Sequence, residues 1–289
     1  MSLLPPLLDA GTLADALGDP SLRVLDATVR LNRPPGGGPY TPESGRDAYE
    51  TEHVPTAGFA DLIVDLADPD APWPFALPPA ARFAAAAGRL GIGPGTHVVV
   101  YAQDSPMWAT RLWWLLRYFG FDAVSVLDGG LPAWRAAGLP LTGEPARHPA
   151  ARFDARPRAG LLATRADVEA IVAGRSACLV NALSDAVFRG EGPTSYSRPG
   201  RIPGSVGVPA AGLLDPATNR FRPTAELTER LDPVLREPAV VLYCGGGISA
   251  TIDVFALSLL GRDDIRLYDG SLAEWSADPS LPLDTGSRA

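Results

Sequence analysis

Histidine and cysteine are scarce in this chain, whose 289 residues include only three of the first and two of the second. A structural zinc site takes about four ligands, drawn mostly from these residue types at short spacings, and no such spacing occurs. A disulfide framework is equally out of place, because a chain of this length can bury a core without covalent staples. We therefore predict neither a metal site nor a fold that depends on disulfides.

Long apolar runs and an excess of positive charge are also missing. No run of about 18 apolar residues occurs, so no segment is expected to span a membrane. The formal net charge is −8, and an acidic surface disfavours nucleic acids and anionic membranes, which attract clusters of Lys and Arg. Residues 1–6 contain a short apolar stretch but no preceding basic segment and no cleavage site, so we expect no signal peptide and a cytoplasmic protein.

What the chain does contain is one pattern twice. In the first half, the apolar residues 98–101 predict a buried strand, residues 108–119 a helix, and residues 123–127 a second strand. The second half repeats this order at residues 240–243, 250–260 and 265–268. Tyr101 and Tyr243 are 142 positions apart, and Asp128 and Asp269 are 141 apart. Such a constant offset predicts a tandem duplication.

The repeated order of strands and helices predicts an α/β fold with two tandem domains. Each domain is expected to have a mainly parallel central sheet flanked by helices. We place the N-terminal domain at residues 1–142 and the C-terminal domain at residues 162–289. Residues 143–161 show little periodicity and several prolines, which is typical of a linker. The tryptophans of the repeats are expected to be core and interface anchors, namely Trp113, Trp114, Trp134 and Trp275.

The two repeats differ at one informative position, the residue after the first matched strand. Ala102 occupies it in the first repeat and Cys244 in the second. Open parallel sheets keep their ligand sites at the carboxyl ends of their strands, so a thiol in one copy predicts a reactive cysteine. Cys178 lies within an apolar run of strand character, and we expect it to be a small buried hydrophobe.

The residues after Cys244 suit an anionic sulfur; they are Gly245, Gly246, Gly247, Ile248 and Ser249. Consecutive glycines adopt backbone conformations forbidden to other residues, so several N–H groups can converge on one point. The loop also enters a helix N-terminus, whose free N–H groups and dipole favour negative charge. Both features favour a thiolate over a thiol. Ser249 is expected to donate a hydroxyl hydrogen bond or to cap the helix.

These residues resemble the rhodanese superfamily, in particular its two-domain thiosulfate and 3-mercaptopyruvate sulfurtransferases. The resemblance runs from about residue 22 to residue 283 and is most specific at residues 112–120, 128–134 and 244–249. It implies a catalytically inactive N-terminal domain, in which Ala102 replaces the cysteine. It also implies a persulfide on Cys244 in the C-terminal domain, and no metal or organic cofactor.

Loop composition separates the enzyme types within this family. Thiosulfate enzymes typically have Cys-Arg-Lys-Gly-Val-Thr and mercaptopyruvate enzymes Cys-Gly-Ser-Gly-Val-Thr, and residues 244–249 look like the second type. Without loop cations, a dianionic donor gains less stabilisation than a monoanionic 2-oxo acid. We therefore expect a two-step transfer of sulfur from 3-mercaptopyruvate, with thiosulfate as the alternative donor, to cyanide, a small thiol or thioredoxin.

The donor-binding arginine of this family has no direct counterpart in the chain. Its motif Arg-Phe/Tyr-x-Gly corresponds to residues 187–190, where Val187 takes the place of the first arginine. Arg189 would point to the same side if this segment were extended, and Arg198 and Arg201 are further candidates for substrate binding. A solvated surface charge is an equal interpretation for each of the three.

Two residues of the first domain are auxiliary candidates. Asp47 and His53 lie in a stretch, residues 45–55, that resembles the family segment facing the active loop across the domain interface. They are predicted to assist proton transfer or orientation. A histidine beside a proline is also typical of a purely structural residue, and that alternative stays open.

Three other functions are rivals to sulfur transfer. A serine hydrolase is excluded because no Gly-x-Ser-x-Gly elbow occurs. A cysteine phosphatase of the cell-cycle kind shares this fold, but its loop is one residue longer and ends in an arginine that grips phosphate, whereas Ala250 and Thr251 follow Ser249 here. A non-catalytic sulfur carrier or partner-binding protein stays open, because of Val187 and the uniformly glycine centre of the loop.

Overall fold

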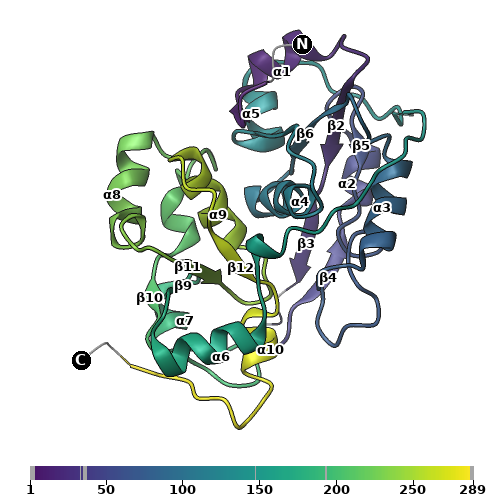
Figure 1. Cartoon of the computed structure of the whole chain (residues 1–289). Helices are drawn as coiled ribbons and strands as arrows, with labels where there is room; N and C mark the ends of the chain where they lie inside the picture. The colour runs from purple at the N-terminus through teal and green to yellow at the C-terminus, as the bar shows by residue number, and fades with distance from the viewer. Residues whose placement is uncertain (1–3, 33, 35–37, 147, 193, 287–289) are drawn as a thin grey trace.

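The computed structural model describes residues 4–32, 34, 38–146, 148–192 and 194–286. The prediction that residues 1–6 are not a signal peptide falls partly on residues 1–3, which lie outside the described residues. Two lobes stand side by side, each built around one sheet, with α4 and α9 between the two sheets (Figure 1). Within the described part of the chain, no helix is long and apolar enough to cross a membrane.

Each lobe has a five-stranded sheet in which every pairing is parallel. The first sheet has the order β1 (Leu7–Leu8), β7 (Val124–Leu127), β6 (His97–Tyr101), β2 (Leu22–Asp26) and β5 (Gly58–Phe59). The second has the order β10 (Val206–Gly207), β9 (Cys178–Asn181), β11 (Val240–Tyr243), β12 (Arg266–Tyr268) and β8 (Leu162–Ala163). A separate antiparallel pair joins β3 (Val29–Asn32) to β4 (Thr41–Ser44). The predicted α/β class is confirmed.

Helices flank both sheets. Those of the first lobe are α1 (Ala10–Ala16), α2 (Arg46–Thr51), α3 (Ala80–Arg89), α4 (Pro106–Tyr118) and α5 (Gly130–Ala136). Those of the second are α6 (Arg165–Gly174), α7 (Asp185–Phe188), α8 (Thr224–Leu235), α9 (Ala250–Leu259) and α10 (Ser271–Trp275), with short 3₁₀ helices η1 (Ala159–Leu161) and η2 (Ala210–Leu213). The predicted helix 108–119 begins two residues earlier because Pro106 takes its first turn, where a missing N–H costs nothing.

Alternate residues of the central strands are buried in different hydrophobic clusters, one on each face of the sheet. Val98 and Val100 point into a large apolar cluster that also includes Val240 and Leu242 of the second sheet. Val99 belongs to a separate cluster on the outer face of the first sheet. Successive strand residues point to opposite faces, so both faces of each sheet are covered. The continuous apolar runs of the sequence follow from this arrangement.

The large cluster crosses from one lobe to the other through α4 and α9, which pack together. Trp113 of α4 meets Phe255 of α9 edge to face, with ring centroids 4.8 Å apart. The hydroxyl groups of Thr110 and Thr251 share a hydrogen bond of 2.7 Å at the same contact. All four tryptophans predicted as anchors are buried, namely Trp113, Trp114, Trp134 and Trp275.

The same contacts recur in both lobes. Tyr101 Oη accepts a hydrogen bond from Val54 N at 3.2 Å, and Tyr243 Oη accepts one from Ile202 N at 3.0 Å. Trp134 and Trp275 likewise each donate from Nε1 to a proline carbonyl, in both cases at 2.8 Å. Tyr101 ends β6 and Tyr243 ends β11. In each lobe this tyrosine therefore anchors the corresponding loop, at Val54 in the first lobe and at Ile202 in the second.

The predicted linker lies against the first lobe. Residues 143–146 and 148–158 form no helix or strand. Ala151 N donates to Gly88 O at 2.9 Å, and the Phe153 ring packs edge to face on Phe83 at 5.4 Å. The boundaries at residues 142 and 162 stay predictions.

Truncation of Phe255 is expected to loosen the packing between the lobes. Phe255 is 0% exposed and contacts Trp113 across the interface, so Phe255→Ala should cost about 3–5 kcal/mol of unfolding free energy. Val64 is 62% exposed, and Val64→Ala should change it by less than about 0.5 kcal/mol. Urea unfolding followed by tryptophan fluorescence measures both. Equal midpoints for the two variants would contradict this account of the core.

Candidate active site

Cys244 lies directly after β11, at the carboxyl end of a strand paired on both sides. Its side chain is buried, with 1% exposure, and neither cysteine forms a disulfide. Cys244 O accepts a hydrogen bond from Leu272 N at 3.1 Å, just as Ala102 O accepts one from Leu131 N at 3.0 Å. The structure therefore places Ala102 where the second lobe has its thiol. Cys178 in β9 is half-buried rather than fully buried as predicted.

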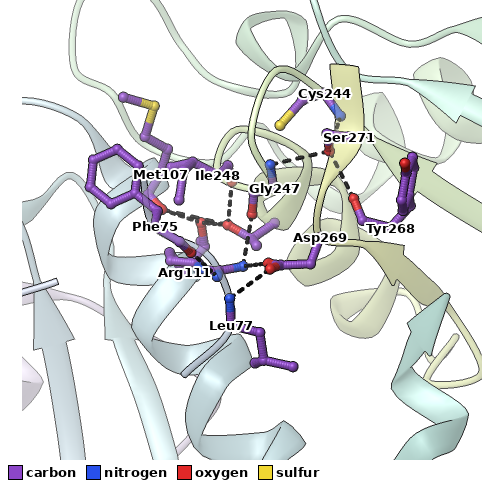
Figure 2. A network of polar contacts seen from close by, with 12 residues as sticks. Phe75, Leu77, Met107, Arg111, Cys244, Gly247, Ile248, Tyr268, Asp269 and Ser271 are labelled. Carbon is purple, nitrogen blue, oxygen red and sulfur yellow. Dashed lines mark hydrogen bonds and ion pairs between the residues drawn. The ribbon is translucent and has the colours of Figure 1, made fainter. Parts of the chain in front are cut away.

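The hydroxyl group of Ser271 holds the loop that follows Cys244 by hydrogen bonds to its backbone (Figure 2). Its Oγ accepts hydrogen bonds from Cys244 N at 3.0 Å and Gly247 N at 3.1 Å, and donates to Tyr268 O at 2.7 Å. Ser271 adopts a φ of +49°, in a region that side chains rarely occupy, whereas the matched residue of the first lobe is Gly130 at +56°. A strained serine replaces a glycine only in the lobe that carries the thiol.

A buried ion pair reaches the same loop from the first lobe (Figure 2). Arg111 of α4 is 1% exposed, and its Nη1 donates to Asp269 Oδ1 at 2.6 Å and to Gly247 O at 3.1 Å. Its Nη2 donates to Phe75 O at 2.7 Å. The second oxygen of Asp269 accepts a hydrogen bond from Leu77 N at 2.7 Å. The pair is thus bonded to both lobes and to the loop.

In the observed conformation, two of the three loop glycines leave no room for a Cβ. A Cβ on Gly245 would lie 1.9 Å from Tyr196 Oη, and a Cβ on Gly247 would lie 2.6 Å from Asp269 O. Gly247 also has a φ of +72°. Nothing lies within 4 Å of a Cβ on Gly246. Gly246 is therefore the one position of the three where a side chain fits.

Four N–H groups of the loop donate no hydrogen bond to another residue of the described chain; they belong to Gly245, Gly246, Ile248 and Ser249. Ser249 precedes α9 in helical conformation and makes no capping bond with its side chain. Its hydroxyl likewise has no bonding partner among the described residues. Of the two roles predicted for Ser249, the structure therefore leaves that of a hydroxyl donor. The predicted cradle of N–H groups is available to an anion.

A cavity of about 640 Å³ opens onto Cys244 and these four loop residues. Its other walls come from both lobes and include five aromatic residues, namely Tyr40, Trp73, Phe75, Trp108 and Tyr196. None of the described residues that line it carries a charge. From these described residues, an anion would meet peptide and hydroxyl dipoles rather than a charged side chain.

Asp253 on α9 is a second buried ionisable group near the thiol. It is 0% exposed, and neither carboxyl oxygen bonds to another described residue. Burial raises the pKa of Asp253 well above its usual value, and the charge of Cys244 raises it further. The carboxyl group therefore favours its protonated, neutral form.

The three arginines predicted to bind substrate do not line the cavity among its described residues. Arg189 pairs with Glu191 at 2.8 Å. Arg198 donates to four backbone carbonyls, including Asp278 O at 2.6 Å. Arg201 donates to Gly286 O at 2.9 Å and stacks on the Phe188 ring at 4.5 Å. Their substrate role stays a prediction, while the contacts of Arg198 and Arg201 favour a structural one.

The auxiliary candidates also lie away from the cavity lining. His53 is buried, with Nδ1 2.6 Å from Tyr49 O and Nε2 3.1 Å from Glu144 O, and its ring stacks on Tyr49. Asp47 is exposed in the first turn of α2. The structural alternative for His53 is the one its contacts favour. Among the described residues, no group of three or more His, Cys, Asp and Glu is arranged to hold a metal ion.

Four residues around the loop were not predicted from the sequence: Arg111, Asp269 and Ser271, which hold the loop, and the buried Asp253. Asp269 served only as a marker of the repeat, yet its match Asp128 also accepts a hydrogen bond from the opposite lobe, at Phe221 N. Two signals were present. A serine stands where the first repeat has Gly130, and Arg111 and Asp253 interrupt apolar helices.

Comparison with known proteins gives consistent results. The family described as "Rhodanese-like domain" matches residues 9–137 and 180–278. The probable 3-mercaptopyruvate sulfurtransferase of Pseudomonas aeruginosa is 38% identical over 288 residues, covering 97% of this chain and 98% of the relative. The 3-mercaptopyruvate sulfurtransferase of Homo sapiens is 35% identical over 282 residues, covering 93% and 91%.

Solved structures agree at the level of the fold. SseA from Escherichia coli, described as a 3-mercaptopyruvate sulfotransferase, superposes with a TM-score of 0.79 at 28% identity. The match covers 93% of this chain and 99% of that protein. Tum1 from Saccharomyces cerevisiae gives a TM-score of 0.84 at 22% identity, which shows the fold alone.

Replacement of Asp253 by asparagine is expected to flatten the pH dependence of stability. In the unfolded chain the carboxyl group ionises near its ordinary pKa of about 4, whereas burial raises that pKa in the folded chain. The folded state then binds more protons, so stability falls as the pH rises from about 4 through the raised pKa. Asp253→Asn should remove this decline, which reaches up to about 1.4 kcal/mol per pH unit.

Urea unfolding between about pH 4 and pH 8 gives the two slopes to compare. The exposed Asp70 supplies the matched control, and Asp70→Asn should keep the wild-type slope. The slope is read rather than the absolute stability, because a buried amide without a partner has its own cost. An unchanged slope in Asp253→Asn would show that the carboxyl group is not held neutral by the fold.

Proposed function

The chain belongs to the rhodanese family, and from this premise we propose that it transfers the sulfur of 3-mercaptopyruvate to a thiol through a persulfide on Cys244. The protein is a sulfurtransferase. One observation supports Cys244 as its sulfur carrier: the buried thiol lies at the end of a parallel strand, beside four N–H groups without a partner among the described residues.

In the first step the Cys244 thiolate attacks the sulfur of the donor. A sulfur–sulfur bond forms and the carbon–sulfur bond breaks, and its electron pair leaves with pyruvate as the enolate, which takes up a proton. The four N–H groups and the Ser249 hydroxyl stabilise negative charge on the donor and then on the persulfide. The helix N-terminus at α9 adds a favourable dipole.

In the second step an acceptor thiolate attacks the outer sulfur of the persulfide. The new sulfur–sulfur bond belongs to the acceptor, and Cys244 leaves as a thiolate, ready for another cycle. A small thiol fits the cavity of about 640 Å³, and thioredoxin and cyanide are the other proposed acceptors. Two cysteines that form no disulfide suit a reducing compartment, so we propose that the reaction takes place in the cytoplasm.

The charge of the cavity supports 3-mercaptopyruvate over thiosulfate as the donor. None of the described lining residues is charged, so a second negative charge on the donor gains little and still loses its hydration. Relatives that cover nearly the whole chain carry the name 3-mercaptopyruvate sulfurtransferase. Thiosulfate remains the alternative donor.

Paired assays with the two donors test both the carrier and the donor. We expect wild type to have a kcat/KM at least about tenfold higher for 3-mercaptopyruvate than for thiosulfate, equivalent to about 1.4 kcal/mol. Cys244→Ser should be inactive with both donors, because its hydroxyl cannot carry sulfane sulfur. Cys178→Ser, which removes the other thiol, is the matched control and should remain active.

Each other outcome points elsewhere. A preference for thiosulfate would overturn the charge argument and keep the persulfide. Activity in Cys244→Ser would remove Cys244 as the carrier. Turnover with neither donor would favour a non-catalytic sulfur carrier or partner-binding protein.

A second prediction concerns Val187, which lines an adjoining cavity of about 400 Å³ that shares Tyr196 and Ser249 with the first. Val187→Arg would add a cation to this cavity. Because a cation attracts a dianion more strongly than a monoanion, the variant should raise kcat/KM for thiosulfate relative to 3-mercaptopyruvate by about tenfold. Val187→Met, which has similar length without charge, is the control. A ratio that moves equally in both variants would assign the effect to shape.

A further inference from the structure

The loop peptides that present a free N–H group share one feature: the carbonyl group of each accepts a hydrogen bond. Every carbonyl behind a free N–H group accepts a hydrogen bond from elsewhere: Cys244 O from Leu272 N, Gly245 O from Ala273 N, Gly247 O from Arg111 and Ile248 O from Thr251 N, at 2.8–3.1 Å. The first, second and fourth donors are backbone groups of the second lobe. Arg111 is a side chain of the first lobe.

A trans peptide points its C=O and its N–H in opposite directions. Gly247 O points to Arg111, so the N–H of Ile248 points away from Arg111. Figure 2 shows Cys244 and Arg111 on opposite sides of Gly247. Ile248 lines the cavity next to Cys244, and its N–H has no partner among the described residues. The contact between Arg111 and Gly247 therefore directs an N–H group toward the sulfur side of the loop.

The peptide after Gly247 turns by rotation about ψ of Gly247 and φ of Ile248. Gly247, whose φ is +72°, has no side chain to restrict its share of that rotation, and the hydrogen bond from Arg111 to Gly247 O opposes it. A flipped peptide would turn the oxygen of Gly247 toward the sulfur and repel a thiolate or persulfide anion. Arg111 is itself fixed by Asp269, by Phe75 O and by stacking over Trp114 at 5.1 Å.

We propose that Arg111 is a positioning residue for sulfur transfer, which locks the peptide between Gly247 and Ile248 so that the Ile248 N–H faces the sulfur anion of Cys244. The lobe that lacks a reactive cysteine thereby takes part in the chemistry of the other lobe. The consequence for turnover rests on the proposed function, whereas the orientation of the peptide does not.

Three variants of α4 test the lock. Arg111→Met removes the donors and keeps much of the apolar stem. Arg111→Lys keeps the charge, but one ammonium group cannot reproduce the fork that serves Asp269, Gly247 and Phe75 together. Arg117→Met is the matched control, because Arg117 also crosses between the lobes, to Asp263 at 2.8 Å, and stacks on Trp113 at 5.0 Å without touching the loop.

The first readout is sulfur loading in a single turnover with 3-mercaptopyruvate, followed by intact mass. Loss of one N–H donor to a developing anion typically costs about 10²–10³-fold in rate. We expect Arg111→Met to slow loading by about 10–100-fold with little change in KM, and Arg111→Lys to fall between it and wild type. Arg117→Met should stay within about threefold of wild type. Thermal unfolding of all three identifies a variant that has simply lost its fold, in which case Arg111→Lys carries the test.

The second readout needs no donor. Protein labelled with ¹⁵N at isoleucine gives an amide signal for Ile248, which Ile248→Val identifies. In wild type this signal should shift as Cys244 ionises, and Cys244→Ser should abolish the shift, which separates it from titration of Asp253. In Arg111→Met the shift should shrink to less than about half, and in Arg117→Met it should persist.

The two readouts separate the possible failures. An Ile248 shift that depends on Arg111 in a protein that takes sulfur from neither donor would uphold the lock and overturn the proposed function. Normal loading in Arg111→Met, together with an unchanged Ile248 shift, would overturn the lock and leave the proposed function standing. A raised KM at unchanged loading rate would also overturn it, because it would assign Arg111 to donor binding.

Discussion

The polarity of the peptide group governs this site. An anionic sulfur is stabilised by N–H groups that have no other partner, yet each of them belongs to a peptide whose carbonyl must find a donor on the other side. The carbonyl groups of the loop after β11 accept hydrogen bonds from three helices that pack against the loop. α10 supplies Leu272 N and Ala273 N, the first turn of α9 supplies Thr251 N, and Arg111 of α4 supplies the last. The order of strand, loop and helix, and the packing of α4 on α9, all contribute to one local arrangement.

The two lobes share a fold but divide the work. At the matched positions the first lobe has Ala102 and Gly130, and the second has Cys244 and Ser271. The thiol and the hydroxyl that holds its loop thus occur together in one lobe only. The first lobe supplies aromatic walls of the cavity, Phe75 and Trp108, and the guanidinium of Arg111. The buried contact between Trp113 and Phe255 keeps these groups in place, because a packed apolar interface resists the small shifts that would separate them.

Much of this arrangement could be predicted from the sequence. The apolar runs 98–101 and 240–243 correspond to β6 and β11, and the comparison of Ala102 with Cys244 located the loop. The arginines could not be placed, because a long side chain on an irregular segment has many possible partners and the pattern of hydrophobic residues says nothing about backbone carbonyls. The guanidinium group of Arg198 donates hydrogen bonds to four such carbonyl groups. Arg111 escaped notice for the opposite reason: within an apolar helix its neighbours predicted burial, and only the fold shows that Asp269 and Gly247 O lie within reach.

The same contacts bear on the proposed preference for a monoanionic donor. Within the described chain, the guanidinium that reaches the loop is that of Arg111, and Asp269 at 2.6 Å neutralises it, so it orients a peptide without adding a net positive charge. Asp253 is held toward its neutral form by burial, and a buried carboxylate beside the thiol would oppose an anion there. Among the described residues, the groups that remain to attract the donor are N–H dipoles and the start of α9, none of which carries a full positive charge. A monoanionic donor replaces its hydration with these dipoles, whereas a dianion gives up far more hydration for the same dipoles. Val187, at the wall of the adjoining cavity, adds no charge that would change this balance.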